Sequence, residues 1–137
     1  MTPAQVSLVQ ESFWRVIPIA PDTAAMFYTR LFEIDPSTRP LFAETDMQEQ
    51  GRKLMETLGV VLIGLTRPET VLGTARDLAV KHVGYGVRAE HYASVGAALI
   101  WTLRQSLGTG FTPEVEAAWQ AAYDLIAGVM TTAAEGG

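Results

Sequence analysis

Apolar side chains recur every three or four residues along almost the whole chain, and this period constrains the fold more than any other feature. It is clearest in residues 48–66, 89–107 and 112–133, where one face of a helix with 3.6 residues per turn would be consistently apolar. The strict alternation of apolar and polar residues that is typical of a half-buried strand is missing. The sequence therefore predicts an all-α fold.

Capping and helix-breaking residues divide this pattern into about seven helical segments. Thr2, Pro3 and Gln5 form a helix-starting pattern, and the two prolines of residues 18–21 are expected to end that first helix. We expect Asp22 to cap the second helix, which ends near Ile34. The other predicted helical segments are residues 35–42, 48–66, 67–82, 89–107 and 112–133. We expect a mobile loop at 43–47, and Gly108 as the C-cap of the segment 89–107.

Length and composition exclude several functional classes. The 137 residues suit a single domain spanning residues 1–137, and the 48% of hydrophobic residues suffices for a buried core. The net charge of −5, without a basic stripe, argues against nucleic acid and against an anionic membrane surface as partners. Because cysteine is absent, disulfides, zinc–thiolate sites and thiol nucleophiles are excluded.

The N-terminal residues and the longest apolar run bear on the localisation of the protein. The first residues, MTPAQV, lack the basic and apolar regions of a secretory signal. The longest apolar run, residues 58–65, is far shorter than the ~20 residues that span a bilayer. We therefore expect a cytoplasmic protein without a membrane partner.

Few residues qualify for chemistry when each is considered alone. His82 shares an apolar helix face with Ala75 and Leu78, a position more typical of a core or boundary histidine than of a ligand. His91, at the start of the next helix, is interpreted as a solvated or capping residue. Tyr28 lies among aromatic and aliphatic residues, so we expect it to be buried with a hydrogen-bond partner.

Five stretches, in this order and spacing, resemble the globin domain of bacterial flavohaemoglobins and related single-domain bacterial globins. They are MFYTRLF at 26–32, RPLF at 39–42, QGRKL at 50–54, KHVGYGV at 81–87 and HYASVG at 91–96. The resemblance extends from the first helix to about Met130. It implies a globin fold around one haem b, iron protoporphyrin IX.

The resemblance also implies a role for each matching residue. His82 corresponds to the proximal histidine that binds the haem iron, and Phe42 to the phenylalanine that packs against the porphyrin. Tyr28 and Gln50 correspond to the distal residues that face a bound gas. Further haem contacts are implied for Lys53 at a propionate and, along the ring, for Leu54, Leu78, Val87, Tyr92 and Val95.

One departure from the flavohaemoglobin pattern concerns the proximal side. That family pairs a tyrosine, here Tyr92, with a glutamate on the last helix, and the two support the proximal histidine. In this chain Ala134 takes the glutamate position and Glu135 follows it, which turns the carboxylate by ~100° around a helix. This puts the full proximal activation of that family in question.

The resemblance implies a globin that binds dioxygen reversibly and tightly, for storage or transport, with nitric oxide and carbon monoxide as further ligands. The alternative is a nitric oxide dioxygenase. Since no flavin domain follows in this sequence, such an enzyme would need a separate reductase. A gas sensor and a haem-free helical bundle remain further alternatives, and no catalytic residue is expected beyond the haem site.

Overall fold

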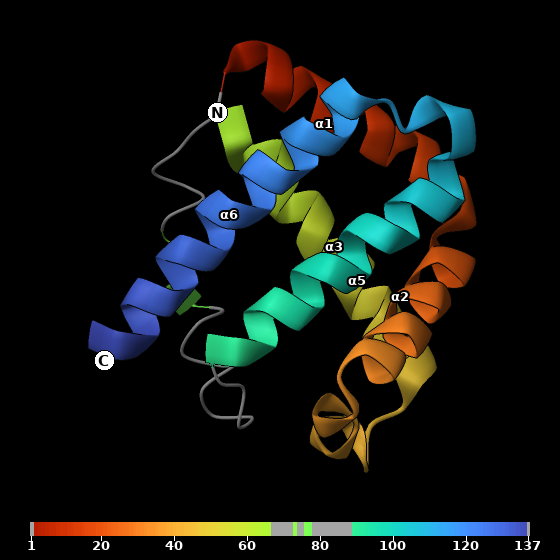
Figure 1. Ribbon diagram of the computed structural model, residues 1–137, viewed down its shortest axis with the longest axis vertical. Coiled ribbons are helices and arrows are strands. Elements are labelled where there is room, and N and C mark those ends of the chain that lie inside the picture. The colour runs from red at the N-terminus through yellow and green to blue at the C-terminus, as the bar shows by residue number, and fades with distance from the viewer. Residues whose placement is uncertain (1, 67–72, 74–75, 78–88, 137) are drawn as a thin grey trace.

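The computed structural model describes residues 2–66, 73, 76–77 and 89–136, and in this part of the chain it contains helices and no strands. Figure 1 shows the arrangement. The α-helices are α1 (Pro3–Val16), α2 (Ala20–Ile34), α3 (Met47–Ile63), α5 (Ala89–Leu107) and α6 (Pro113–Gly136). Short 3₁₀ segments are η1 (Ile17–Ile19), η2 (Pro36–Phe42), η3 (Gly64–Thr66) and η4 (Gly108–Gly110). The all-α prediction is confirmed, whereas most of the predicted segment 67–82 lies outside the described residues.

The connection between α1 and α2 corrects one prediction. Thr2 and Gln5 form the expected capping box, and α1 ends at Val16, just before the two prolines, as predicted. The chain nevertheless stays helical through residues 18–21, first as η1 and then as α2. Pro18 lies in the first turn of η1 and Pro21 in the first turn of α2, where a helix needs no backbone N–H. Consequently α2 begins at Ala20, and Asp22 is an acidic residue of its first turn rather than its cap.

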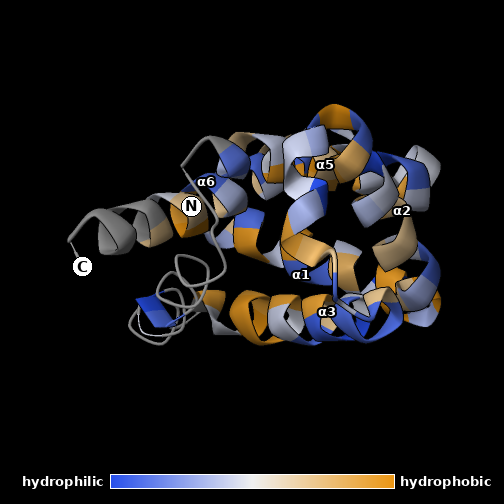
Figure 2. Cartoon of the chain, turned by 90° about the horizontal axis from the view of Figure 1, so that it is seen from below, coloured by the Kyte–Doolittle hydropathy of each residue, from blue (hydrophilic) through white to orange (hydrophobic). Residues whose placement is uncertain are grey.

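The core lies where α1 meets α6 and where α2 meets both α3 and α5. Figure 2 shows α1 between α3 on one side and the α5–α6 pair on the other. Trp119 of α6 is 1% exposed, and its indole Nε1 donates a hydrogen bond to Ser12 Oγ at 2.7 Å. At the end of α5, Gly108 adopts a positive φ of 54°, as the predicted C-cap requires.

Two glycines allow helices to approach closely. A Cβ at Gly51 of α3 would lie 2.9 Å from Ala24 Cβ of α2, closer than two such atoms can pack. A Cβ at Gly96 of α5 would lie 2.7 Å from Tyr123 Cε2 of α6. The α2–α3 crossing at Gly51 positions the site described next. No helix among the described residues is long and apolar enough to span a membrane.

Candidate functional site

Tyr28 and Gln50, which are 22 residues apart, meet where α2 crosses α3. Gln50 Nε2 donates a hydrogen bond to Tyr28 Oη at 3.1 Å, and the tyrosine side chain is buried. Burial raises the pKa of Tyr28 above 10.0, while the bond from Gln50 opposes that rise. The phenol is therefore neutral at pH 7. Because its oxygen accepts from Gln50, its own hydrogen is not used in this bond and can be donated elsewhere.

Aromatic rings surround this polar pair. The Phe42 ring lies 5.3 Å from the Tyr28 ring in an edge-on arrangement and 5.7 Å from that of Phe32. Phe27 also packs edge-on against the Tyr28 ring, at 4.9 Å. The phenol and the amide thus adjoin a cluster of aromatic rings, and the Arg39 guanidinium lies 5.4 Å from the centre of the Phe32 ring.

The segment that carries Phe42 is fixed at its start by Asp35. Asp35 Oδ1 accepts a hydrogen bond from the backbone N–H of Ser37 at 3.1 Å and another from the Ser37 hydroxyl. Its Oδ2 accepts from Ser94 Oγ of α5 at 2.8 Å. The bonds from Ser37 and then Ser94 lower the pKa of Asp35 below its ordinary value. A capped and cross-linked η2 thus holds Phe42 beside Tyr28.

His91 lies next to this cluster, and its predicted place was wrong. The side chain is only 4% exposed, and Nε2 lies 3.5 Å from Ser37 Oγ. His91 is therefore neither solvated nor a surface cap. The available signal was its spacing from Val95 and Ala98, positions i+4 and i+7, which places it on the inward face of α5.

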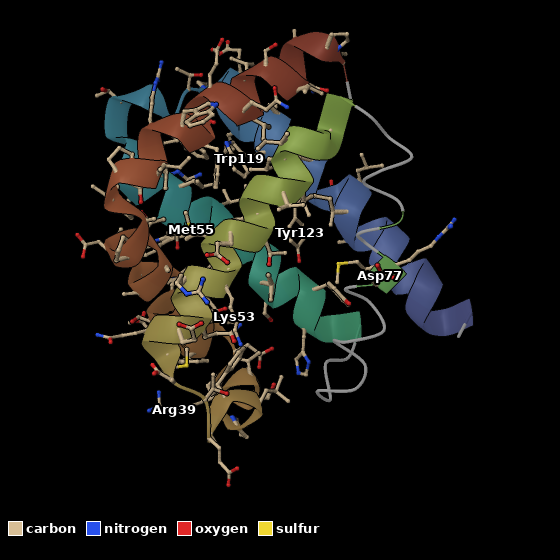
Figure 3. The ribbon with its side chains drawn as sticks, turned by 180° about the vertical axis from the view of Figure 1, so that it is seen from behind. Arg39, Lys53, Met55, Asp77, Trp119 and Tyr123 are labelled. Carbon is tan, nitrogen blue, oxygen red and sulfur yellow. The ribbon has the colours of Figure 1, made fainter. Side chains whose placement is uncertain are left out.

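The other predicted haem contacts in the described residues lie on α3 and α5. Leu54, one turn after Gln50, is half-buried and packs against the core, while Lys53 is exposed. Figure 3 shows Lys53 toward the end of the molecule that also carries Arg39. Val95 and Tyr92 of α5 are half-buried.

A residue of α6 contacts the Tyr92 backbone, and the sequence pattern did not predict this contact. The hydroxyl of Tyr123, labelled in Figure 3, donates to the Tyr92 backbone carbonyl, and its ring occupies the space left by Gly96. His82, Leu78 and Val87 lie outside the described residues, as do the side chains of residues 134 and 135, so their roles stay predictions.

The part of the site formed by Tyr28, Gln50 and the neighbouring aromatic rings suits a haem group. Haem presents a broad, largely apolar face, and a diatomic ligand on that face needs nearby hydrogen-bond donors and shelter from water. The aromatic residues around Tyr28 supply the apolar surface. Tyr28 and Gln50 supply two neutral donors that lie close together.

Comparison with known proteins agrees with this arrangement. The Globin family model matches residues 25–130. The flavohemoprotein of Bordetella pertussis is 37% identical over 106 residues, which cover 76% of this chain and 26% of that protein. The flavohemoprotein of Vibrio cholerae is 28% identical over 133 residues, covering 95% of this chain and 34% of that protein. The chain thus spans about a quarter to a third of the length of these relatives. It belongs to the globin family and is a haem-binding globin.

Proposed function

We propose that this globin binds dioxygen reversibly and with high affinity, using haem b bound to the protein through His82. The observation that carries this proposal is the hydrogen bond from Gln50 Nε2 to Tyr28 Oη. When bound, the haem supplies an iron atom to which a diatomic gas attaches. The residues of the chain then determine how long that gas stays.

Tyr28 is the principal donor to the gas. Gln50 donates to the phenol oxygen, which orients the hydroxyl and leaves its hydrogen for an acceptor outside the pair. A dioxygen molecule bound there would attract this donor, because it would carry partial negative charge. A hydrogen bond to a charged group contributes about 1.5–3 kcal/mol. The pair therefore favours dioxygen over carbon monoxide, which carries less negative charge.

The apolar residues make that bond effective. Phe42 would pack against the porphyrin, as its position on η2 beside the Tyr28 ring suggests. Leu54 would limit the space for water on the same side. In such surroundings a hydrogen bond is stronger than on the surface, because water does not compete for the donor.

The remaining assignments complete the haem environment. A neutral imidazole of His82 would hold the iron, and Leu78, Val87, Tyr92 and Val95 would line the ring. Lys53, which is exposed, would reach a propionate. Tyr123 would keep the Tyr92 backbone in place through its bond to the Tyr92 carbonyl.

A second candidate function is nitric oxide dioxygenase. It is supported by the names of the relatives, which are flavohemoproteins and so associate a flavin with a haem. The same Tyr28–Gln50 pair would hold dioxygen while nitric oxide reacts with it. For this chain the electrons would come from a separate reductase.

The test begins with haem-loaded, reduced and desalted protein, which is mixed with air while its visible spectrum is followed for an hour. A persistent two-banded oxygenated spectrum supports reversible binding. Decay to the ferric form within seconds contradicts it. If oxygenated protein instead converts nitric oxide to nitrate over many turnovers with an added reductase, the dioxygenase is the better description.

A further inference from the structure

An apolar patch lies on the outer surface where α1 meets α3, away from the Tyr28–Gln50 pair. It consists of Trp14 of α1, Ile17 of η1 and Val60 and Ile63 of α3, which are 65%, 42%, 59% and 67% exposed. Trp14, Ile17 and Ile63 line one hollow, and Val60 lies one helical turn before Ile63. These four residues expose on the order of 500 Å² together, a size that the largest apolar patch of a monomer reaches and that is often functional. We call this surface the α1–α3 patch.

A hollow lies within the α1–α3 patch. It measures about 320 Å³ and is lined by residues from both helices, including Gln10, Phe13, Gly59 and Leu62. Gly59 leaves it open, because an added Cβ there would meet only the Phe13 ring, at 3.6 Å. Trp14, the largest exposed side chain of the patch, lies at the edge of this hollow. A projecting ring and an empty depression thus occupy one surface.

This pairing of a projection with a depression is what a two-fold symmetric contact requires. In such a contact the same patch is used twice, so each copy must present both halves of the fit. We propose that the α1–α3 patch joins two copies of this chain in a homodimer, with Trp14 of each copy seated in the hollow of the other.

The size of the surface agrees with a second copy as the occupant. A standard interface buries ~800 Å² per partner, of which about two thirds is apolar in homodimers. The α1–α3 patch supplies that apolar portion. Glu56, one turn before Val60, is paired with Arg52, whereas Glu11, one turn before Trp14, is exposed and would lie at the rim of the contact.

The association is measured on haem-loaded protein by analytical ultracentrifugation, from low micromolar to several hundred micromolar concentration. We expect the mass to rise from 14.9 kDa toward twice that value and then to stop rising. Protein that remains monomeric over this range overturns the proposal. So does growth beyond the dimer, since an open-ended contact is not two-fold.

Two opposite variants test the fit itself. Trp14→Ser removes the projection and Gly59→Leu fills the hollow, and each is expected to weaken dimerisation at least about tenfold, as loss of a central tryptophan contact does. Leu125→Ser is the matched control: Leu125 is also exposed, at 44%, but lies on α6 outside the patch, and its dimerisation should equal that of the wild type. Thermal melting checks that the variants remain folded.

Mixing the two variants gives the most specific result. One copy then retains a hollow and the other a tryptophan, so one of the two contacts is restored and the mixture should associate more tightly than either variant alone. If the mixture associates no better, or if both variants dimerise like the wild type, Trp14 does not occupy this hollow and the proposal fails. Wild-type protein that stays monomeric yet binds lipid vesicles would assign the patch to a membrane instead.

Discussion

Replacing Tyr28 with phenylalanine tests the proposed function most directly. The change removes one oxygen atom from a buried ring whose packing against Phe27 and Phe42 can persist. What disappears is the acceptor for Gln50 Nε2 and the hydroxyl hydrogen proposed to reach the gas. Since the aromatic surroundings are retained, the variant isolates the hydrogen bond from the shape of the site.

The expected effect follows from the environment of the hydroxyl. A hydrogen bond to a partly charged acceptor contributes about 1.5–3 kcal/mol, which corresponds to roughly a 10- to 150-fold faster dissociation of dioxygen. The lower half of this range is the better expectation. Without the phenol, the Gln50 amide loses its acceptor and can turn toward the gas, which compensates for part of the loss.

The assay is stopped-flow displacement of dioxygen from the reduced, haem-loaded protein. Dissociation of carbon monoxide is the internal control, and it should change far less because that ligand carries less negative charge. Gln50→Leu is the companion variant, and we expect it to raise the rate of dioxygen dissociation less than Tyr28→Phe does. In the double variant, the combined effect on this rate should be smaller than the product of the two single effects. An unchanged dioxygen rate in Tyr28→Phe would show that the phenol does not contact the gas.

Three further predictions concern contacts that hold the core and the site in place. Gly51→Ala should lower the free energy of unfolding by about 1–3 kcal/mol, since the new Cβ would lie 2.9 Å from a Cβ of α2. Gly59→Ala on the same helix is the control and should be neutral or stabilising. Guanidinium titration of both variants and the wild type measures the difference. Ser12→Ala should cost about 1–3 kcal/mol by leaving the indole N–H of Trp119 without its acceptor, and a cost near zero would mean that water replaces the hydroxyl. The pKa of Asp35 in the folded protein lies below 3.8, so its ionised carboxylate stabilises the fold above that pH, and this stabilisation is lost as the pH falls through the folded pKa. In acid unfolding, Asp35→Asn should therefore lose less stability than the wild type over this pH range.

Local sequence patterns predicted most of the helices. The boundaries of α5 agree with the prediction from apolar spacing, and α3 begins one residue earlier than predicted and passes into η3 near its expected end. The prolines were correctly taken as the end of α1, which stops at Val16, but the start of the second helix was predicted too late, at Asp22 instead of Ala20. Both prolines lie in first turns, where a helix needs no backbone N–H, so a new helix can begin at each of them.

Tertiary contacts were less accessible to such reasoning. His91 was interpreted from its neighbours in sequence, whereas in the structure it is buried and lies 3.5 Å from Ser37, which is 54 residues earlier. The contact between Tyr28 and Gln50 likewise depends on how closely α2 and α3 cross. The resemblance to globins predicted that Tyr28 and Gln50 belong to one site, whereas the spacing of apolar residues alone gave no reason to place them together.

The crossing of α2 and α3 and the distal pair are one structural feature. Ala24 lies one helical turn before Tyr28, and Gly51 directly follows Gln50, so the closest approach of the two helices adjoins the bond between phenol and amide. A side chain at position 51 would separate the helices and lengthen that bond, although residue 51 itself donates nothing to a ligand. Phe42, by contrast, is held through Asp35 and Ser94, on the α5 side of the molecule. Changes at Gly51 should therefore alter the discrimination between dioxygen and carbon monoxide, while changes at Asp35 should act mainly on how firmly the haem is retained.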